Sequence, residues 1–88
     1  MATKTAYDLL LEAPDGQITR CQLAWKSIAS GEWADAAHYL RNAAAEEGKT
    51  EWAAEARALA DICMKRLNRD HRVAQQQMAA RLPGASRV

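Results

Sequence analysis

The 88-residue sequence contains no phenylalanine, only two prolines and only four glycines. Its apolar residues make up 49% of the chain. This apolar fraction and the scarcity of glycine and proline together exclude a disordered or low-complexity chain. No run of about 18 apolar residues is present, so the sequence predicts no membrane span. Residues 1–5 lack the apolar core and the cleavage site of a signal peptide, and we therefore expect a cytoplasmic protein.

Catalytic and metal-binding motifs are also missing. The sequence has neither a glycine-rich phosphate loop nor a nucleophile elbow. Two cysteines and two histidines would suit tetrahedral zinc, but no pair of them has the spacing of a zinc finger or ribbon. These residues are Cys21, His38, Cys63 and His71. Both cysteines lie on apolar helical faces, where a cysteine is usually a buried, reduced thiol. We expect no cofactor and no bound metal.

Four glutamates lie close together in the sequence, at Glu46, Glu47, Glu51 and Glu55. Paired carboxylates can act as general acid and general base. These four fall on the polar side of predicted helix ends, however, which favours a solvated acidic face. Together with the missing motifs, this pattern predicts that the protein is not an enzyme.

Helical signals recur along the chain, whereas the alternation of apolar and polar residues that is typical of strands is absent. Breaks at residues 14–16, 30–31 and 48 separate four predicted helices. These helices cover residues 5–12, 19–29, 32 or 33 to 47, and 50–82. The predicted fold class is all-α: a small antiparallel bundle of three main helices plus a short N-terminal helix, with an extended last helix.

The three main helices each carry an apolar stripe. We expect the second helix to start at Thr19, because Thr19 and Gln22 have the spacing of a capping box and Ile18 and Leu23 that of a hydrophobic staple. Its predicted buried face holds Cys21, Ala24, Trp25, Ile28 and Ala29. The stripe of the third helix holds Trp33, Ala36, Ala37, Leu40, Ala43 and Ala44. Thr50 is the expected N-cap of the last helix, whose stripe holds Trp52, Ala56, Leu59, Cys63 and Leu67.

Beyond Leu67 the same face of the last helix becomes polar, with Asp70, Gln77 and Arg81 in the next positions. We therefore divide the chain into a bundle core (1–67), a projecting basic extension (68–82) and a disordered tail (83–88). Residues 65–88 carry six basic residues against one acidic, a net charge of +5, while residues 1–64 carry six basic and ten acidic, a net −4. The i, i+4 pairs Arg57–Asp61, Asp61–Lys65 and Arg66–Asp70 are expected to neutralise part of the basic patch.

The turn between the second and third helices has the sequence Gly31-Glu32-Trp33-Ala34-Asp35-Ala36, preceded by Leu23-Ala24 and followed by Ala43. This pattern resembles the inter-helix turn of a tetratricopeptide repeat, with a glycine, an acidic residue, an aromatic and a small alanine. The resemblance covers residues 19–67, as one unit and part of a second. It implies a helical hairpin of a family built from stacked helix pairs.

These features predict a protein–protein interaction module, either a small adaptor or an inhibitor that docks on a larger protein or complex. We expect its binding groove between the second and fourth helices, with Trp25, Trp52 and Glu55 as contacts, and Trp52 as the tryptophan that is only partly covered.

The alternative is nucleic-acid binding through the basic helix at residues 65–81. Its predicted contacts, which would also suit an acidic protein partner, are Lys65, Arg66, Arg69 and Arg72. A homodimer through the last helix is compatible with both readings, because Val73 and Met78 would gain cover.

Overall fold

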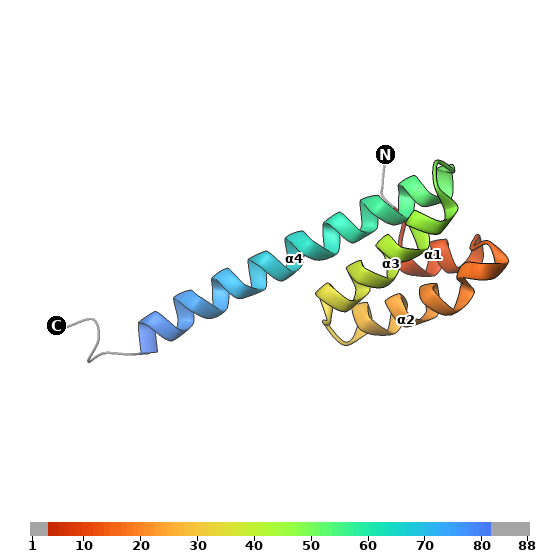
Figure 1. The fold of residues 1–88 in the computed structure, drawn as a ribbon. Coiled ribbons are helices and arrows are strands. Elements are labelled where there is room, and N and C mark those ends of the chain that lie inside the picture. The colour runs from red at the N-terminus through yellow and green to blue at the C-terminus, as the bar shows by residue number, and fades with distance from the viewer. Residues whose placement is uncertain (1–3, 82–88) are drawn as a thin grey trace.

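The computed structural model describes the backbone of residues 4–81 and the side chains of residues 4–77. Its elements are α1 (Ala6–Leu11), a single 3₁₀ turn η1 (Asp15–Gln17), α2 (Ile18–Ala29), α3 (Trp33–Glu47) and α4 (Glu51–Arg81). Residues 4–81 contain no strand. Helices α1 and α3 pack against the first half of α4, and α2 packs on α1 and α3, while the second half of α4 extends away from all three (Figure 1). The predicted all-α bundle is confirmed, and no helix within the described range is both long and apolar enough to cross a membrane.

Local signals set most helix ends as predicted. Thr5 caps α1 through a capping box, in which its hydroxyl accepts from the Asp8 amide at 3.2 Å and the Asp8 carboxylate accepts from the Thr5 amide at 3.1 Å. Thr50 caps α4, because its hydroxyl accepts from the Ala53 amide at 3.1 Å. α3 spans the predicted residues and ends at Gly48.

The start of α2 differs from the prediction. The chain enters α2 directly from η1, with Gln17 in the N-cap position and no side-chain capping bond. The Gln17 amide donates to the Pro14 carbonyl at 2.8 Å, so the backbone is already turning helically before Thr19. Thr19 therefore lies inside the first turn, and the predicted capping box is wrong.

The buried face of α2 is also rotated from the predicted one. Ala24 and Ser27 are buried, whereas Trp25 is 44% exposed and packs against Tyr7 of α1 with 5.4 Å between the ring centroids. The prediction that Trp25 lies on a buried stripe is thus wrong. The side chains that α2 turns toward the interior, Ala24, Ser27 and Cys21, are small. Small side chains let helices approach each other closely.

The core is built largely from alanine. The α3 stripe is confirmed, since Ala36, Ala37, Leu40, Ala43 and Ala44 are each no more than 1% exposed. α4 faces it with Ala53, Ala56 and Ala60, and α3–α4 is the most extensive helix pair in the fold. Leu9 and Leu40 are the largest fully buried side chains. Few large residues therefore supply most of the hydrophobic stabilisation, while alanines bring the helix backbones together.

Two helices are each followed by a glycine that has a positive φ, Gly31 (φ 74°) after α2 and Gly48 (φ 72°, ψ −115°) after α3. We expect Gly48→Ala to lower the free energy of unfolding by about 1–3 kcal/mol, because an L-residue is strained in that conformation. Gly16→Ala is the matched control, because a Cβ at either position meets no atom within 4 Å and Gly16 has no positive φ. Urea denaturation of both variants measures the difference. Equal losses would contradict a backbone origin.

α4 leaves the body one turn beyond the end of its apolar stripe. Leu67 is half-buried, and all side chains from residue 68 to residue 77 are exposed. Asp70 still contacts the body, since its carboxylate accepts from the Trp33 indole Nε1 at 2.9 Å. The predicted i, i+4 pairs are wrong, because Asp70 bonds Trp33 and Asp61 pairs with Arg41 of α3 at 3.1 Å. The tail predicted to be disordered (83–88) lies outside the described residues.

Candidate functional site

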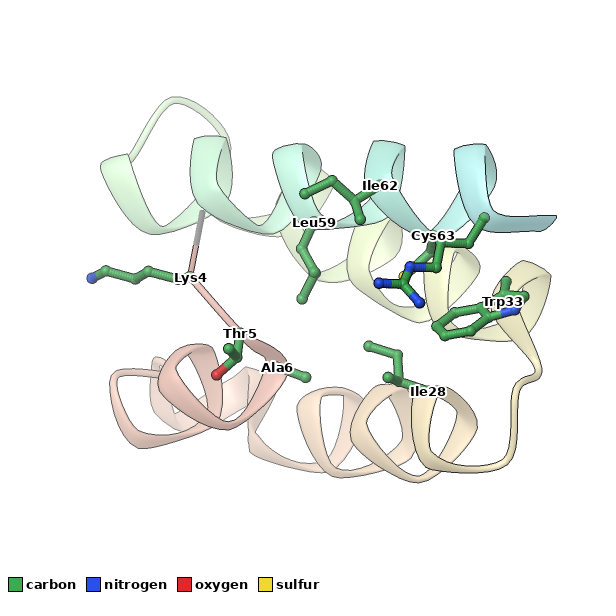
Figure 2. Close-up of a pocket in the computed structure, with 9 residues that line it drawn as sticks. Lys4, Thr5, Ala6, Ile28, Trp33, Leu59, Ile62 and Cys63 are labelled. Atoms are coloured by element: carbon green, nitrogen blue, oxygen red, sulfur yellow. The ribbon is translucent and has the colours of Figure 1, made fainter. Parts of the chain in front are cut away.

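An open pocket of about 290 Å³ lies between α2 and α4, with α3 behind it (Figure 2). α1 packs against both α2 and α4, and its first residues form one end of this pocket. Trp33, at the start of α3, forms the other end. The pocket is lined by Lys4, Thr5, Ala6, Ile28, Trp33, Leu59, Ile62, Cys63 and Arg66. The space between α2 and α4 is therefore filled by α1 at one end and is open beyond the first residues of α1.

Aliphatic side chains make the walls of the pocket. Ile28 reaches in from α2, and Leu59 reaches in from α4 on the opposite side (Figure 2). Ile28 and Ile62 are only half-buried, so both present apolar surface to the opening. Cys63 is 1% exposed, and burial raises the pKa of its thiol, an effect that the nearby Arg66 charge opposes. The thiol is thus held in its protonated form, which is a poor nucleophile.

Trp33 and Arg66 form the far end of the pocket. The guanidinium carbon of Arg66 lies 5.5 Å from the centroid of the Trp33 ring, within the range of a cation–π contact. The Trp33 indole also donates a hydrogen bond to Asp70, one turn beyond Arg66 on α4. The α2–α3 turn is therefore tied to the point where α4 leaves the body, and the pocket ends beside a cation.

Lys4 lines the pocket but its side chain points away from it (Figure 2). The ammonium pairs with Glu12 of α1's C-terminal end and with Glu55 of α4 at 3.0 Å. The hydrogen bonds that the Lys4 ammonium donates to Glu12 and then to Glu55 raise the pKa of Lys4 above its ordinary value. Glu55, predicted as a partner contact, thus ties the chain before α1 to α4.

The other two predicted contacts lie elsewhere in the bundle. Trp52 is half-buried, and its Nε1 donates to the Leu9 carbonyl at 3.0 Å, so it anchors α1 to α4. Trp25 is the most exposed of the three tryptophans and lies against Tyr7. The structure does not gather Trp25, Trp52 and Glu55 around the pocket between α2 and α4. Sequence reasoning missed Ile62, which lies outside the predicted stripe and gave no signal of its own.

The four predicted basic contacts are exposed on α4. At 100° per residue, Lys65, Arg69 and Arg72 fall within roughly 60° of one another and roughly 150° from the core positions Ala60 and Cys63. They form a basic face directed away from the core, and Arg69 lies at the edge of this face that is nearest Ile62. Arg66 lies roughly 60° further round α4 from Arg69, on the side that lines the pocket.

A second polar cluster joins α2 to the end of α3. The Gln17 side chain, 1% exposed, donates to Glu46 at 3.2 Å and to Glu47 at 3.1 Å, and accepts from Arg20 at 2.9 Å. Hydrogen bonds from Arg20 and Gln17 lower the pKa of Glu46. Two of the four clustered glutamates therefore bind Gln17, and the predicted acidic face is partly a structural contact.

The residues considered as zinc ligands are separated. Cys21 and Cys63 are buried free thiols, while His38 is exposed and shares a 3.1 Å hydrogen bond with Asn42. Over the described residues, no three His, Cys, Asp or Glu side chains come together as a metal site would need.

No protein-family model, curated protein or solved structure gives a match to this chain.

Proposed function

We propose that this protein is a docking module, a small adaptor or inhibitor, which binds another protein through the pocket between α2 and α4. The observation that supports this most directly is the open apolar space at Ile28, Leu59 and Ile62, beside a core built largely from alanine. Concave apolar surface beside a few polar groups is typical of binding sites.

The size of the pocket favours a protein side chain as its occupant. Sites for small molecules and cofactors usually enclose roughly 300–1,000 Å³. At about 290 Å³ and open on one side, this pocket lies at the lower end of that range. It suits one or two large apolar side chains of a partner, which is how hot spots at protein interfaces are anchored.

The tetratricopeptide-like hairpin remains part of this proposal. The geometry of the α2–α3 turn supports this resemblance, with Gly31 at φ 74° and Trp33 half-buried at the start of α3. Proteins built from stacked helix pairs bind their partners on concave helical surfaces. By this analogy, the pocket beside Trp33 would be the binding surface of this protein.

The proposal predicts that Ile62→Asp abolishes capture of the partner. The full chain, immobilised, is mixed with nuclease-treated lysate of the cells that express it, and captured proteins are identified by mass spectrometry. Burying one Ile is worth about 1.5–3 kcal/mol, so loss of this contact should weaken binding about tenfold or more. Ile62→Trp, which fills the pocket without adding charge, should have the same effect.

Leu23→Asp is the control, because Leu23 is a 38% exposed aliphatic residue of α2 that does not line the pocket. Circular dichroism verifies that each variant is folded. Capture that survives both Ile62 variants but is lost with Leu23→Asp would overturn the proposed site, and a chain that captures no protein would overturn the proposed function.

The alternative function, nucleic-acid binding, draws on the basic face of Lys65, Arg69 and Arg72. Nuclease treatment separates the two readings, since a complex held together by DNA or RNA disappears with it. Self-association through the exposed part of α4 is checked in the same preparation by sedimentation velocity.

A further inference from the structure

The pocket is continuous with a stripe that runs along the free part of α4. Leu59, Ile62 and Arg66 line the pocket. At 100° per residue, Arg69 and Val73 continue the same side of the helix, at the i+3 and i+4 steps of a helical stripe. Val73 is 44% exposed, and Arg66 and Arg69 are exposed. A partner that enters the pocket and follows α4 outward therefore passes from apolar surface onto cationic surface.

The charge of this stretch has one sign. From residue 62 to residue 77, α4 carries Lys65, Arg66, Arg69 and Arg72 against Asp70 alone, a net charge of +3 with histidine neutral. The Asp70 carboxylate already accepts the indole hydrogen bond of Trp33. Such a surface attracts an anionic partner and repels a cationic one.

We infer that the partner presents an amphipathic helix with one large apolar side chain, which enters the pocket beside Ile62, and acidic residues that follow it along Arg66 and Arg69. This inference rests on the proposed docking function and names the chemistry of its partner. At 1.5 Å per residue, Arg66 and Arg69 lie about 6 and 10 Å beyond Ile62 along α4. A helix laid along α4 matches them with Asp or Glu about four and about seven residues from its apolar anchor.

A helix fits this position because α1 is one. α1 lies between α2 and α4 and contacts both, and the pocket opens at its first residues, Thr5 and Ala6. A partner helix that lies over the pocket, with one side chain inside it, would pack along α4 at the usual helix–helix distance of about 8–10 Å.

The pocket favours a protein over a nucleic acid. Its walls are aliphatic at Ile28, Leu59 and Ile62, and aliphatic walls complement apolar side chains. The aromatic ring in the lining, Trp33, has the Arg66 guanidinium over it. Nucleic acids bind single bases by stacking on open aromatic faces, and phosphates need no apolar cavity.

The test selects binders from a displayed library of random peptides of about 16 residues, long enough for four helical turns, against the full-length chain. Enriched peptides should share a large apolar residue with Asp or Glu about four and seven positions away. The affinity of a synthesised winner is then measured by fluorescence anisotropy. Arg69→Glu should weaken it about three- to thirtyfold, Ile62→Asp should weaken it more, and raising NaCl from about 0.1 to 0.5 M should weaken it as well.

Lys49→Glu is the matched control, because Lys49 is an exposed cation in the α3–α4 turn, at the other end of the body from Arg69. Enriched peptides that are neutral or basic, or that bind the Arg69→Glu variant unchanged, would overturn the inference. Displacement of the peptide by a duplex DNA of about 20 base pairs would also overturn it, because the surface would then bind nucleic-acid phosphates. If capture of a cellular partner depends on Ile62 but the selected peptides are not acidic, the docking function stands. Only the inference that the partner is acidic is then refuted.

Discussion

Replacing Leu40 by alanine is expected to cost about 3–5 kcal/mol of unfolding free energy, the range for a fully buried leucine that leaves a cavity. Leu40 is 1% exposed, and with Leu9 it is the largest fully buried side chain among the described residues. A domain of this size has only roughly 4–13 kcal/mol in total. The alanine-rich surroundings cannot fill the space, so urea denaturation should show a midpoint lowered by more than about 1 M.

Leu11→Ala supplies the control for the same chemical change. Leu11 is 67% exposed, and truncating it should shift stability by less than about 0.5 kcal/mol. If Leu40→Ala does not yield folded protein, Leu40→Met, which keeps the volume, should fold at a cost below about 1.5 kcal/mol. A Leu40→Ala variant as stable as Leu11→Ala would mean that the α3 stripe is not the centre of the core.

Replacing Ala56 by leucine is expected to cost about 1–3 kcal/mol of unfolding free energy, because the larger side chain has no room at the closely packed α3–α4 contact. Ala56 is 0% exposed and belongs to the central apolar cluster. The loss should appear as a lower thermal midpoint by circular dichroism, and as weaker protection of α3 and α4 amides from hydrogen exchange.

Ala54→Leu is the matched variant, two residues away on the same helix and exposed. Leucine and alanine differ little in helix propensity, so Ala54→Leu should change stability by under about 0.5 kcal/mol. The difference between the two variants isolates packing from helix formation. Equal stability would show that α3 and α4 can separate to admit a leucine, which is inconsistent with a close alanine contact.

The predicted groove illustrates what could be foreseen about the site. An open space between the second and fourth helices was expected, and the pocket lies there, but Trp25, Trp52 and Glu55 do not line it. Trp52 and Glu55 bond the segment around α1 instead. Long side chains at the surface of a bundle have several partners within reach, and periodicity does not choose between them.

The charged residues of α4 show the same limit. Asp61 and Asp70 each had a basic residue at i−4, which favours a pair within the helix. In the folded chain Asp61 meets Arg41 of α3, and Asp70 meets Trp33. A pair within an exposed helix is worth only about 0.2–0.5 kcal/mol, so a partner on a neighbouring helix readily replaces it.

The sequence by itself determined the helices, their glycine breaks, the cap at Thr50, and the apolar stripe of α3. These features depend on residues within one turn of each other, whose spacing and backbone preferences can be read directly. The tertiary structure decided which face α2 buries, what Asp70 binds, and that the six-residue α1 fills only part of the groove between α2 and α4. Those outcomes depend on side-chain volumes from three or four helices at once, and no local pattern contains them.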